Sequence, residues 1–149
     1  MGGVYTEASM SLDGYIAAPG DTGFDQLFQW YGNGDVAIAT AKPEMTFRIS
    51  QASAGHLRHT LDDTGALVVG RRLFDLVGGW DGRHPMDKPV VVVTHHVPEG
   101  WPRPGAPFTF VTDGVPFFDH VRDAPVELSN PTVVEGDRVT HLYYRVRRA

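Results

Sequence analysis

Three short runs of apolar residues constrain the fold of this chain more than any other feature of its sequence. Ala66-Leu67-Val68-Val69 and Pro89-Val90-Val91-Val92-Val93-Thr94 are almost entirely apolar, and a shorter run covers residues 108–112. Continuous apolar runs of this length are typical of strands buried on both faces of a parallel sheet. An amphipathic segment, residues 71–77, follows the first run. The alternation of strand and helix therefore predicts right-handed crossovers and a partly parallel sheet.

The rest of the chain adds elements to this sheet. Residues 4–10 are rich in β-forming residues and predict a first strand, followed by a loop at residues 11–20 with Asp-Gly and Pro-Gly pairs. A short amphipathic helix is expected around residues 24–31, and Ser50 is the expected N-cap of a second helix. Residues 132–146 predict a hairpin that turns near Gly136-Asp137, with one face in the core.

The expected fold is thus a single α/β domain over residues 1–149, with a mixed, mainly parallel central sheet flanked by helices and an antiparallel C-terminal hairpin. The 149 residues suffice for one domain, and the absence of cysteine excludes disulfides, thiolate zinc sites and cysteine nucleophiles. A net charge of −5 argues against nucleic acid as a partner. The first ten residues lack the basic and apolar regions of a signal peptide, so we expect none, and no apolar stretch approaches the ~18–20 residues that cross a bilayer. We therefore expect no membrane association and a cytoplasmic location.

One candidate anion site follows the first buried strand. Gly70 ends the apolar run, and Arg71 and Arg72 begin the helix after it. Backbone N–H groups at a helix start favour phosphate, and either arginine could bind it in a bidentate manner. A plain strand-to-helix turn with solvated arginines explains the same residues, so both interpretations stay open here.

A second polar group follows the next apolar run, at Thr94-His95-His96. Ligands of open α/β sheets gather at the carboxyl ends of parallel strands, and a hydroxyl with two imidazoles suits a phosphate or a ribose. Adjacent residues of an extended chain point to opposite sides, and no histidine spacing resembles a zinc motif, so we expect no metal.

Taken together, these segments resemble the dihydrofolate-reductase-like superfamily, and in particular the bacterial reductases related to the C-terminal reductase domain of riboflavin biosynthesis. The similarity extends in order over nearly the whole chain. The matching stretches are residues 11–17, 66–75, Gly79-Trp80, 89–96, 111–115 and 139–146.

The resemblance implies NADPH as hydride donor to a small heterocyclic or carbonyl substrate. It suggests that Ile16 and Ala17 face the nicotinamide, with Asp13 beside them. It assigns phosphate to Gly70, Arg71 and the following helix start with Arg72, and the adenosine ribose and its phosphate to Thr94, His95 and His96. The implied substrate pocket holds Asp25, Phe28 and Trp30, with Trp80 nearby. Asp25 is the candidate for the carboxylate that helps to protonate the substrate, although a solvent-facing position on a surface helix explains it equally well.

The chain departs from the family pattern after Val115. Members of the family continue there through a helix, a strand ending in a Gly-Gly turn that wraps the cofactor pyrophosphate, and a further helix and strand. By that comparison about 45 residues are missing. In the fold of that family these two strands flank the first strand. The resemblance therefore implies that residues 4–10 lose their ladder partners, and each unpaired buried backbone group costs about 1–3 kcal/mol.

Three outcomes are open: the hairpin pairs with the first strand, a second copy fills the gap, or the sequence is a shortened form of a longer chain. We favour a homodimer, intertwined or strand-swapped. The expected function is an NADPH-dependent reductase with an impaired pyrophosphate site. The alternative is a non-catalytic ligand-binding or regulatory protein that keeps the fold without the full cofactor site.

Overall fold

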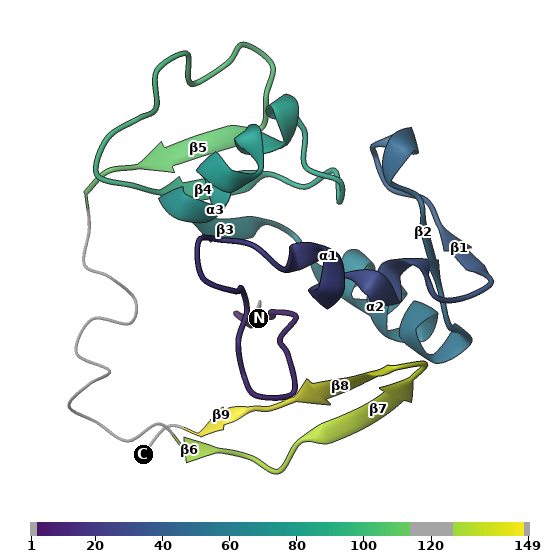
Figure 1. The fold of residues 1–149 in the computed structure, drawn as a ribbon. Coiled ribbons are helices and arrows are strands. Elements are labelled where there is room, and N and C mark those ends of the chain that lie inside the picture. The colour runs from purple at the N-terminus through teal and green to yellow at the C-terminus, as the bar shows by residue number, and fades with distance from the viewer. Residues whose placement is uncertain (1–2, 114–126, 148–149) are drawn as a thin grey trace.

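The computed structural model describes residues 3–113 and 127–147, which form a mixed α/β arrangement (Figure 1). The helices are α1 (Phe24–Leu27), α2 (Gln51–Asp63) and α3 (Arg71–Leu76), with 3-10 turns η1 (Gln29–Gly32), η2 (Pro43–Met45) and η3 (Gly78–Gly82). The strands are β1 (Val36–Ile38), β2 (Phe47–Ile49), β3 (Leu67–Gly70), β4 (Val90–Val93), β5 (Phe108–Val111), β6 (Glu127–Leu128), β7 (Thr132–Gly136), β8 (Val139–Tyr143) and β9 (Val146–Arg147).

The three apolar runs form the parallel sheet that the sequence predicts. Its order is β3-β4-β5, with Leu67 opposite Val90 and Val90 opposite Phe108. Helix α3 follows β3 directly and covers one face, where Phe74 packs against Val92 and Phe108. Indole and phenyl rings of Trp80, Trp101 and Phe110 complete this cluster.

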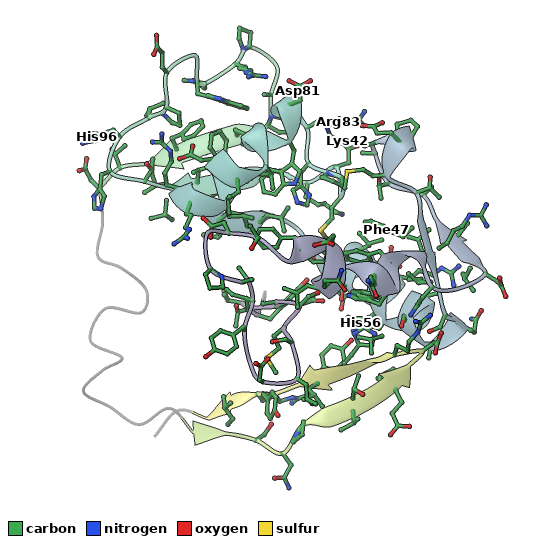
Figure 2. The ribbon with its side chains drawn as sticks, viewed as in Figure 1. Lys42, Phe47, His56, Asp81, Arg83 and His96 are labelled. Carbon is green, nitrogen blue, oxygen red and sulfur yellow. The ribbon has the colours of Figure 1, made fainter. Side chains whose placement is uncertain are left out.

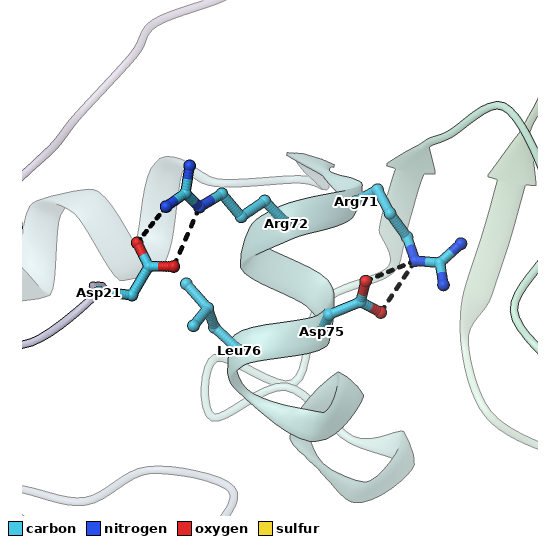
Figure 3. A pocket seen from close by; sticks show the side chains of 5 residues that line it. All are labelled: Asp21, Arg71, Arg72, Asp75 and Leu76. Atoms are coloured by element: carbon cyan, nitrogen blue, oxygen red, sulfur yellow. Dashed lines mark hydrogen bonds and ion pairs between the residues drawn. The ribbon is translucent and has the colours of Figure 1, made fainter. Parts of the chain in front are cut away.

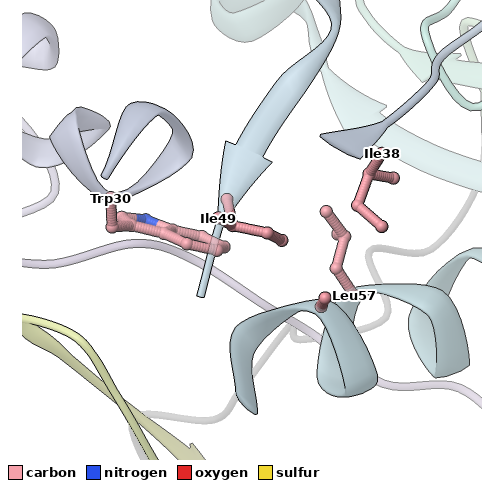
Figure 4. Packing of buried hydrophobic residues seen from close by; sticks show 5 residues of the cluster. Trp30, Ile38, Ile49 and Leu57 are labelled. Atoms are coloured by element: carbon pink, nitrogen blue, oxygen red, sulfur yellow. The ribbon is translucent and has the colours of Figure 1, made fainter. Parts of the chain in front are cut away.

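A second hydrophobic cluster lies away from the parallel sheet, between α2, the β1-β2 pair and η1 (Figure 4). Its centre is Ile49, which is fully buried, with Trp30, Ile38 and Leu57 around it. The Ser50 hydroxyl accepts a hydrogen bond from the Ser53 amide at 3.2 Å, which confirms Ser50 as the N-cap of α2.

The predicted C-terminal hairpin is confirmed as β7-β8, paired from Thr132–Tyr143 to Gly136–Val139. Its inner face packs on α2, where His141 is buried. The described strands form four separate sheets, β1-β2, β3-β4-β5, β6-β9 and β7-β8, and only the second is parallel. Within the described residues, the hairpin pairs with neither the parallel sheet nor the N-terminal segment.

The prediction of a strand over residues 4–10 is wrong. This segment forms no strand in the structure, and the side chains of Val4 and Met10 are 85% and 58% exposed. A strand requires a ladder partner, and no described strand lies in register with these residues. Side chains attach the segment instead: the Tyr5 hydroxyl meets that of Thr64, and Glu7 approaches His56.

The prediction that the first two apolar runs are buried on both faces is also wrong. Val68 on β3 is 71% exposed and Val93 on β4 is 52% exposed, whereas Val92 is fully buried. The apolar runs therefore form the expected strands, but among the described residues a helix covers only one side of them. No helix in residues 3–113 and 127–147 has the length and apolar character needed to cross a membrane.

Candidate functional site

The first turn of α3 brings together two of the groups that the sequence singled out. Arg71 Nη1 donates to the His96 carbonyl at 3.0 Å and lies 3.4 Å from Thr94 Oγ1. Thr94 Oγ1 in turn donates to the same carbonyl at 2.9 Å, and His95 between them is exposed. Because β3 and β4 are parallel, their carboxyl ends meet at one edge of the sheet, and Arg71 bridges them.

The N-terminal loop also reaches α3. Arg72 donates from Nε and Nη2 to the carboxylate of Asp21, which directly follows the Asp-Gly and Pro-Gly loop. Figure 3 shows this pair on one side of α3, with Leu76 beside it, and the pair of Arg71 with Asp75 on the other side. An open pocket of about 600 Å³ is lined by these five residues. The structure thus places the loop and the Gly70-Arg71 step next to each other.

Carboxylates balance the arginines in this pocket. Arg71 Nε donates to both oxygens of Asp75 at 2.8 Å, an i,i+4 pair on a helix of six residues. Arg71 Nη2 and Arg72 Nη1 take part in no hydrogen bond found among the described residues. A bound phosphate would therefore find two free donor nitrogens, but it would compete with Asp21 and Asp75.

The residues expected near the nicotinamide and the substrate proton do not gather in this pocket. Asp13 accepts a hydrogen bond from Ser11 within its own loop, Ile16 is 61% exposed and Ala17 is half-buried. Asp25 is exposed on α1 and accepts a hydrogen bond from its neighbour Gln26. Thus no closed site for a nicotinamide or a substrate forms around these four residues within the described part of the chain.

The aromatic residues assigned to the substrate separate into different places. Trp30 is 8% exposed and belongs to the hydrophobic cluster between α2, the β1-β2 pair and η1. Phe28 is 41% exposed and stacks on Tyr31. Trp80 lies in η3, beside the other cluster. The two tryptophans therefore belong to two different hydrophobic clusters.

Trp80 belongs to an unusual turn after α3. The five residues of η3 all have positive φ angles between 48° and 89°, including Trp80 and Asp81, which are not glycines. Such a left-handed turn is costly for residues with a Cβ. The Trp80 ring meets the His84 ring edge-on at 4.4 Å, and His84 Nδ1 accepts a hydrogen bond from the Met86 amide.

Acidification is expected to destabilise the fold through His84. Burial lowers the pKa of His84 from 6.5 to about 4. Between these values the unfolded chain binds a proton that the folded chain does not, so the free energy of unfolding falls as the pH falls. We expect a loss of about 1–3 kcal/mol across this window, since His84 is only partly buried. Thermal unfolding followed by circular dichroism at several pH values measures it.

The variant His84→Gln should flatten this pH dependence. An equal slope for the His84 variant and the wild-type protein would contradict the assignment. Burial and the neighbouring His56 also lower the pKa of His141, against a smaller opposing effect of Glu7, so His141 contributes in the same direction.

His141 belongs to a polar cluster that sequence reasoning missed. Its ring lies 4.1 Å from that of His56 on α2, and its Nε2 is 3.2 Å from Ser53 Oγ. His56 Nε2 is 3.3 Å from Glu7, and His56 Nδ1 is buried without a partner among the described residues. Figure 2 shows His56 far from His96, so this cluster is separate from the pocket on α3. Within the described ranges, no group of three or more potential ligand side chains is placed to hold a metal ion.

The sequence also missed the two carboxylates of the pocket. The Arg71–Asp75 pair could have been predicted from the sequence, because an arginine and an aspartate four residues apart share one helix face. The Arg72–Asp21 pair could not, since 51 positions separate the two residues.

Comparisons of the chain with family models, with curated proteins and with solved structures found no match.

Proposed function

We propose that this protein binds NADPH through the pocket on α3 and uses it as hydride donor to a small heterocyclic or carbonyl substrate. The observation that supports the proposal is the bridge that Arg71 makes between the carboxyl ends of β3 and β4, beside the loop held by Arg72. Cofactor phosphates of α/β proteins bind at such edges. The choice of NADPH rests on the resemblance to dihydrofolate-reductase-like reductases.

The donor set fits the phosphorylated adenosine end of the cofactor. Among the described residues, Arg71 Nη2 and Arg72 Nη1 have no hydrogen-bond partner, and two guanidinium groups are suited to phosphate oxygens. The buried Thr94 hydroxyl already donates to the His96 carbonyl and holds Arg71 in place rather than contacting the cofactor itself. Asp21 and Asp75 would shift when phosphate takes their place. NADPH, when bound, supplies the hydride, whereas the described residues do not form a pocket for the nicotinamide. We therefore assign no residue to the chemical step.

The variant Arg71→Ala should weaken NADPH binding by about 10- to 100-fold, because it removes a charge-assisted hydrogen bond worth about 1.5–3 kcal/mol. Asp75→Asn should tighten binding a few-fold, since it keeps the shape of the side chain and removes the competing charge. Titration of the purified protein, followed by nicotinamide fluorescence, measures both affinities.

Arg58→Ala on α2 is the matched control, because it removes the same charge from another helix and should leave the affinity unchanged. Equal losses in the Arg71 and Arg58 variants would show that only net charge matters. No binding at millimolar NADPH would remove the cofactor proposal altogether.

A non-catalytic binding or regulatory role is the second candidate. It is favoured by the placement of Trp30 in a hydrophobic cluster and of Asp25 on an exposed helix, away from the pocket on α3. NADPH oxidation in the presence of small carbonyl and heterocyclic compounds separates the two candidates. Binding without oxidation supports the second, and oxidation above the protein-free rate supports the first.

A further inference from the structure

Two buried histidines join α2 to the β7-β8 hairpin, which lies beside this helix (Figure 1). His56 stands on α2, and His141 is the central residue of β8. The centres of their rings are 4.1 Å apart, and Ser53 Oγ, one turn before His56, is 3.2 Å from His141 Nε2. The packing of the hairpin on α2 therefore includes two side chains of the type that titrates near neutral pH. We call His56 and His141 the histidine pair.

One carboxylate faces the histidine pair. Glu7, in the N-terminal segment, lies 3.3 Å from His56 Nε2 and is half-exposed. Tyr143 meets the His56 ring edge-on, and Tyr31 of η1 stays neutral because burial and the Glu7 charge raise its pKa to about 12. Glu135 of β7 lies on the other face of the hairpin, because the residue before it pairs with the second histidine. Within the described part of the chain, Glu7 is thus the only charged group that forms a hydrogen bond or an ion pair with either ring.

The hydrogen bonds around the histidine pair suit two neutral rings. His56 Nδ1 is buried without a partner among the described residues. A neutral His56 keeps its proton on Nε2, toward Glu7, whereas a proton on Nδ1 would be a buried donor without an acceptor. The Ser50 hydroxyl donates to Ser53 Oγ at 3.1 Å, which leaves the Ser53 proton for Nε2 of a neutral His141.

Acid disturbs this arrangement. Two protonated rings with centres 4.1 Å apart repel each other where little water screens them, and the Glu7 carboxylate offsets only one of the two charges. Burial and the neighbouring His56 lower the pKa of His141, with Glu7 opposing them. An open arrangement therefore takes up protons before the closed one as the pH falls below 6.5, the ordinary value for histidine, and the equilibrium shifts toward opening.

The hairpin is the element that this shift can release. Among the described strands, β7 and β8 pair only with each other, and a two-stranded hairpin by itself is marginally stable in water. Its inner face is held by His141 on α2 and by Val139, which packs against the cluster around Ile49. At the turn, the Asn33 side chain donates to the Asp137 carbonyl at 2.6 Å. The histidine pair is therefore a central part of a small contact.

We propose that the histidine pair is a pH-sensitive latch: protonation of both rings releases the β7-β8 hairpin from α2 while the parallel sheet stays folded. Release uncovers Trp30, whose ring meets that of His141 edge-on at 5.2 Å, and with it the apolar cluster that Trp30 belongs to. The latch lies away from the pocket on α3, so it does not depend on the proposed cofactor.

Hydrogen exchange followed by mass spectrometry, at about pH 7.5 and about pH 5, tests the latch in the wild-type protein. After correction for the intrinsic exchange rates, the amides of residues 132–143 should be at least about 10-fold less protected in acid, since each unit of pKa difference changes the opening equilibrium tenfold. In acid they should also be at least about 10-fold less protected than the amides of β3 and β4. Unchanged protection of the hairpin overturns the latch. Equal protection of hairpin and sheet at both pH values overturns it too, because the hairpin then opens only when the whole fold does.

Two variants assign the effect to the histidine pair. His141→Gln and His56→Gln each remove one of the two charges, so the loss of hairpin protection in acid should shrink to less than about 3-fold. His84→Gln is the matched control, because His84 is a partly buried histidine beside Trp80, away from the hairpin, and this variant should lose hairpin protection as the wild-type protein does. If either glutamine variant of the pair folds and keeps the full loss, or if the His84 variant no longer shows it, the proposal is wrong. The wild-type comparison decides even if neither variant of the pair folds.

Discussion

Replacing Gly34 by alanine is expected to lower the free energy of unfolding by at least about 3 kcal/mol, a large share of the roughly 5–15 kcal/mol of a domain. A Cβ at Gly34 would overlap the carbonyl group of Ile49 and the amide nitrogen of Ser50. These are backbone atoms at the end of β2 and the N-cap of α2, so no side chain can rotate to relieve the overlap. The Gly34 amide also donates to the Arg48 carbonyl at 3.0 Å, which fixes the approach.

Denaturant unfolding at equilibrium measures the change, with Gly32→Ala as the control. A Cβ at Gly32 would meet no atom within 4 Å, so this variant should stay within about 1 kcal/mol of the wild-type protein. If Gly34→Ala unfolds at the same denaturant concentration as the control, Gly34 and the end of β2 do not lie as close together as the structure has them.

The local elements of this fold could be predicted from sequence because their causes are local. Ser50 caps α2 through a bond to an amide three residues away, and the hairpin around Gly136 needs only alternation and a turn. The segment at residues 4–10 has equally good strand composition and forms no strand. Its outcome depends on partner strands elsewhere in the chain, and composition carries no information about them.

The exposure of Val68 has the same origin. Its apolar run predicts a strand, and β3 forms, but the run cannot say whether a second layer is present to cover the outer face. The same distinction between local and distant causes applies to the candidate site. Sequence placed Arg71 and Thr94 at the ends of neighbouring parallel strands, and the structure brings them within 3.4 Å. Asp21 reaches Arg72 only through tertiary packing, so no spacing in the sequence marks it.

The turn at residues 78–82 could be predicted from the sequence only in part. A glycine pair after a helix predicts a C-cap and a turn, and α3 does end in a turn at this pair. The left-handed backbone extends further, through Trp80 and Asp81, than glycine composition alone suggests. Gly79 is enclosed by the rings of Trp101 and Phe74, whose atoms lie 2.6 Å and 2.8 Å from the place of a Cβ. Packing of the aromatic cluster therefore fixes this turn, and with it the end of α3.

Phe74→Ala is expected to lower the free energy of unfolding by about 3–5 kcal/mol, as the loss of a large buried ring does. Phe74 is 3% exposed, and its ring centre lies 5.0 Å from that of Trp101 and 5.5 Å from that of Phe110. It is the only buried residue of α3, so the position of this helix on the sheet depends on it. Leu73→Ala, at the 45% exposed neighbour, should cost less than about 1 kcal/mol.

Phe74→Ala also tests whether the pocket on α3 depends on how this helix packs on the sheet. Arg71 and Arg72 stand on the turn that precedes Phe74, and a shift of about 1 Å is enough to weaken oriented contacts. At a temperature where the variant is still folded, its affinity for NADPH should fall at least about 10-fold, whereas Leu73→Ala should bind as the wild-type protein does. If the Phe74 variant is folded and less stable but binds NADPH as tightly as the wild-type protein, the cofactor does not bind at α3. A site on that helix should be disturbed when the buried Phe74 ring is removed.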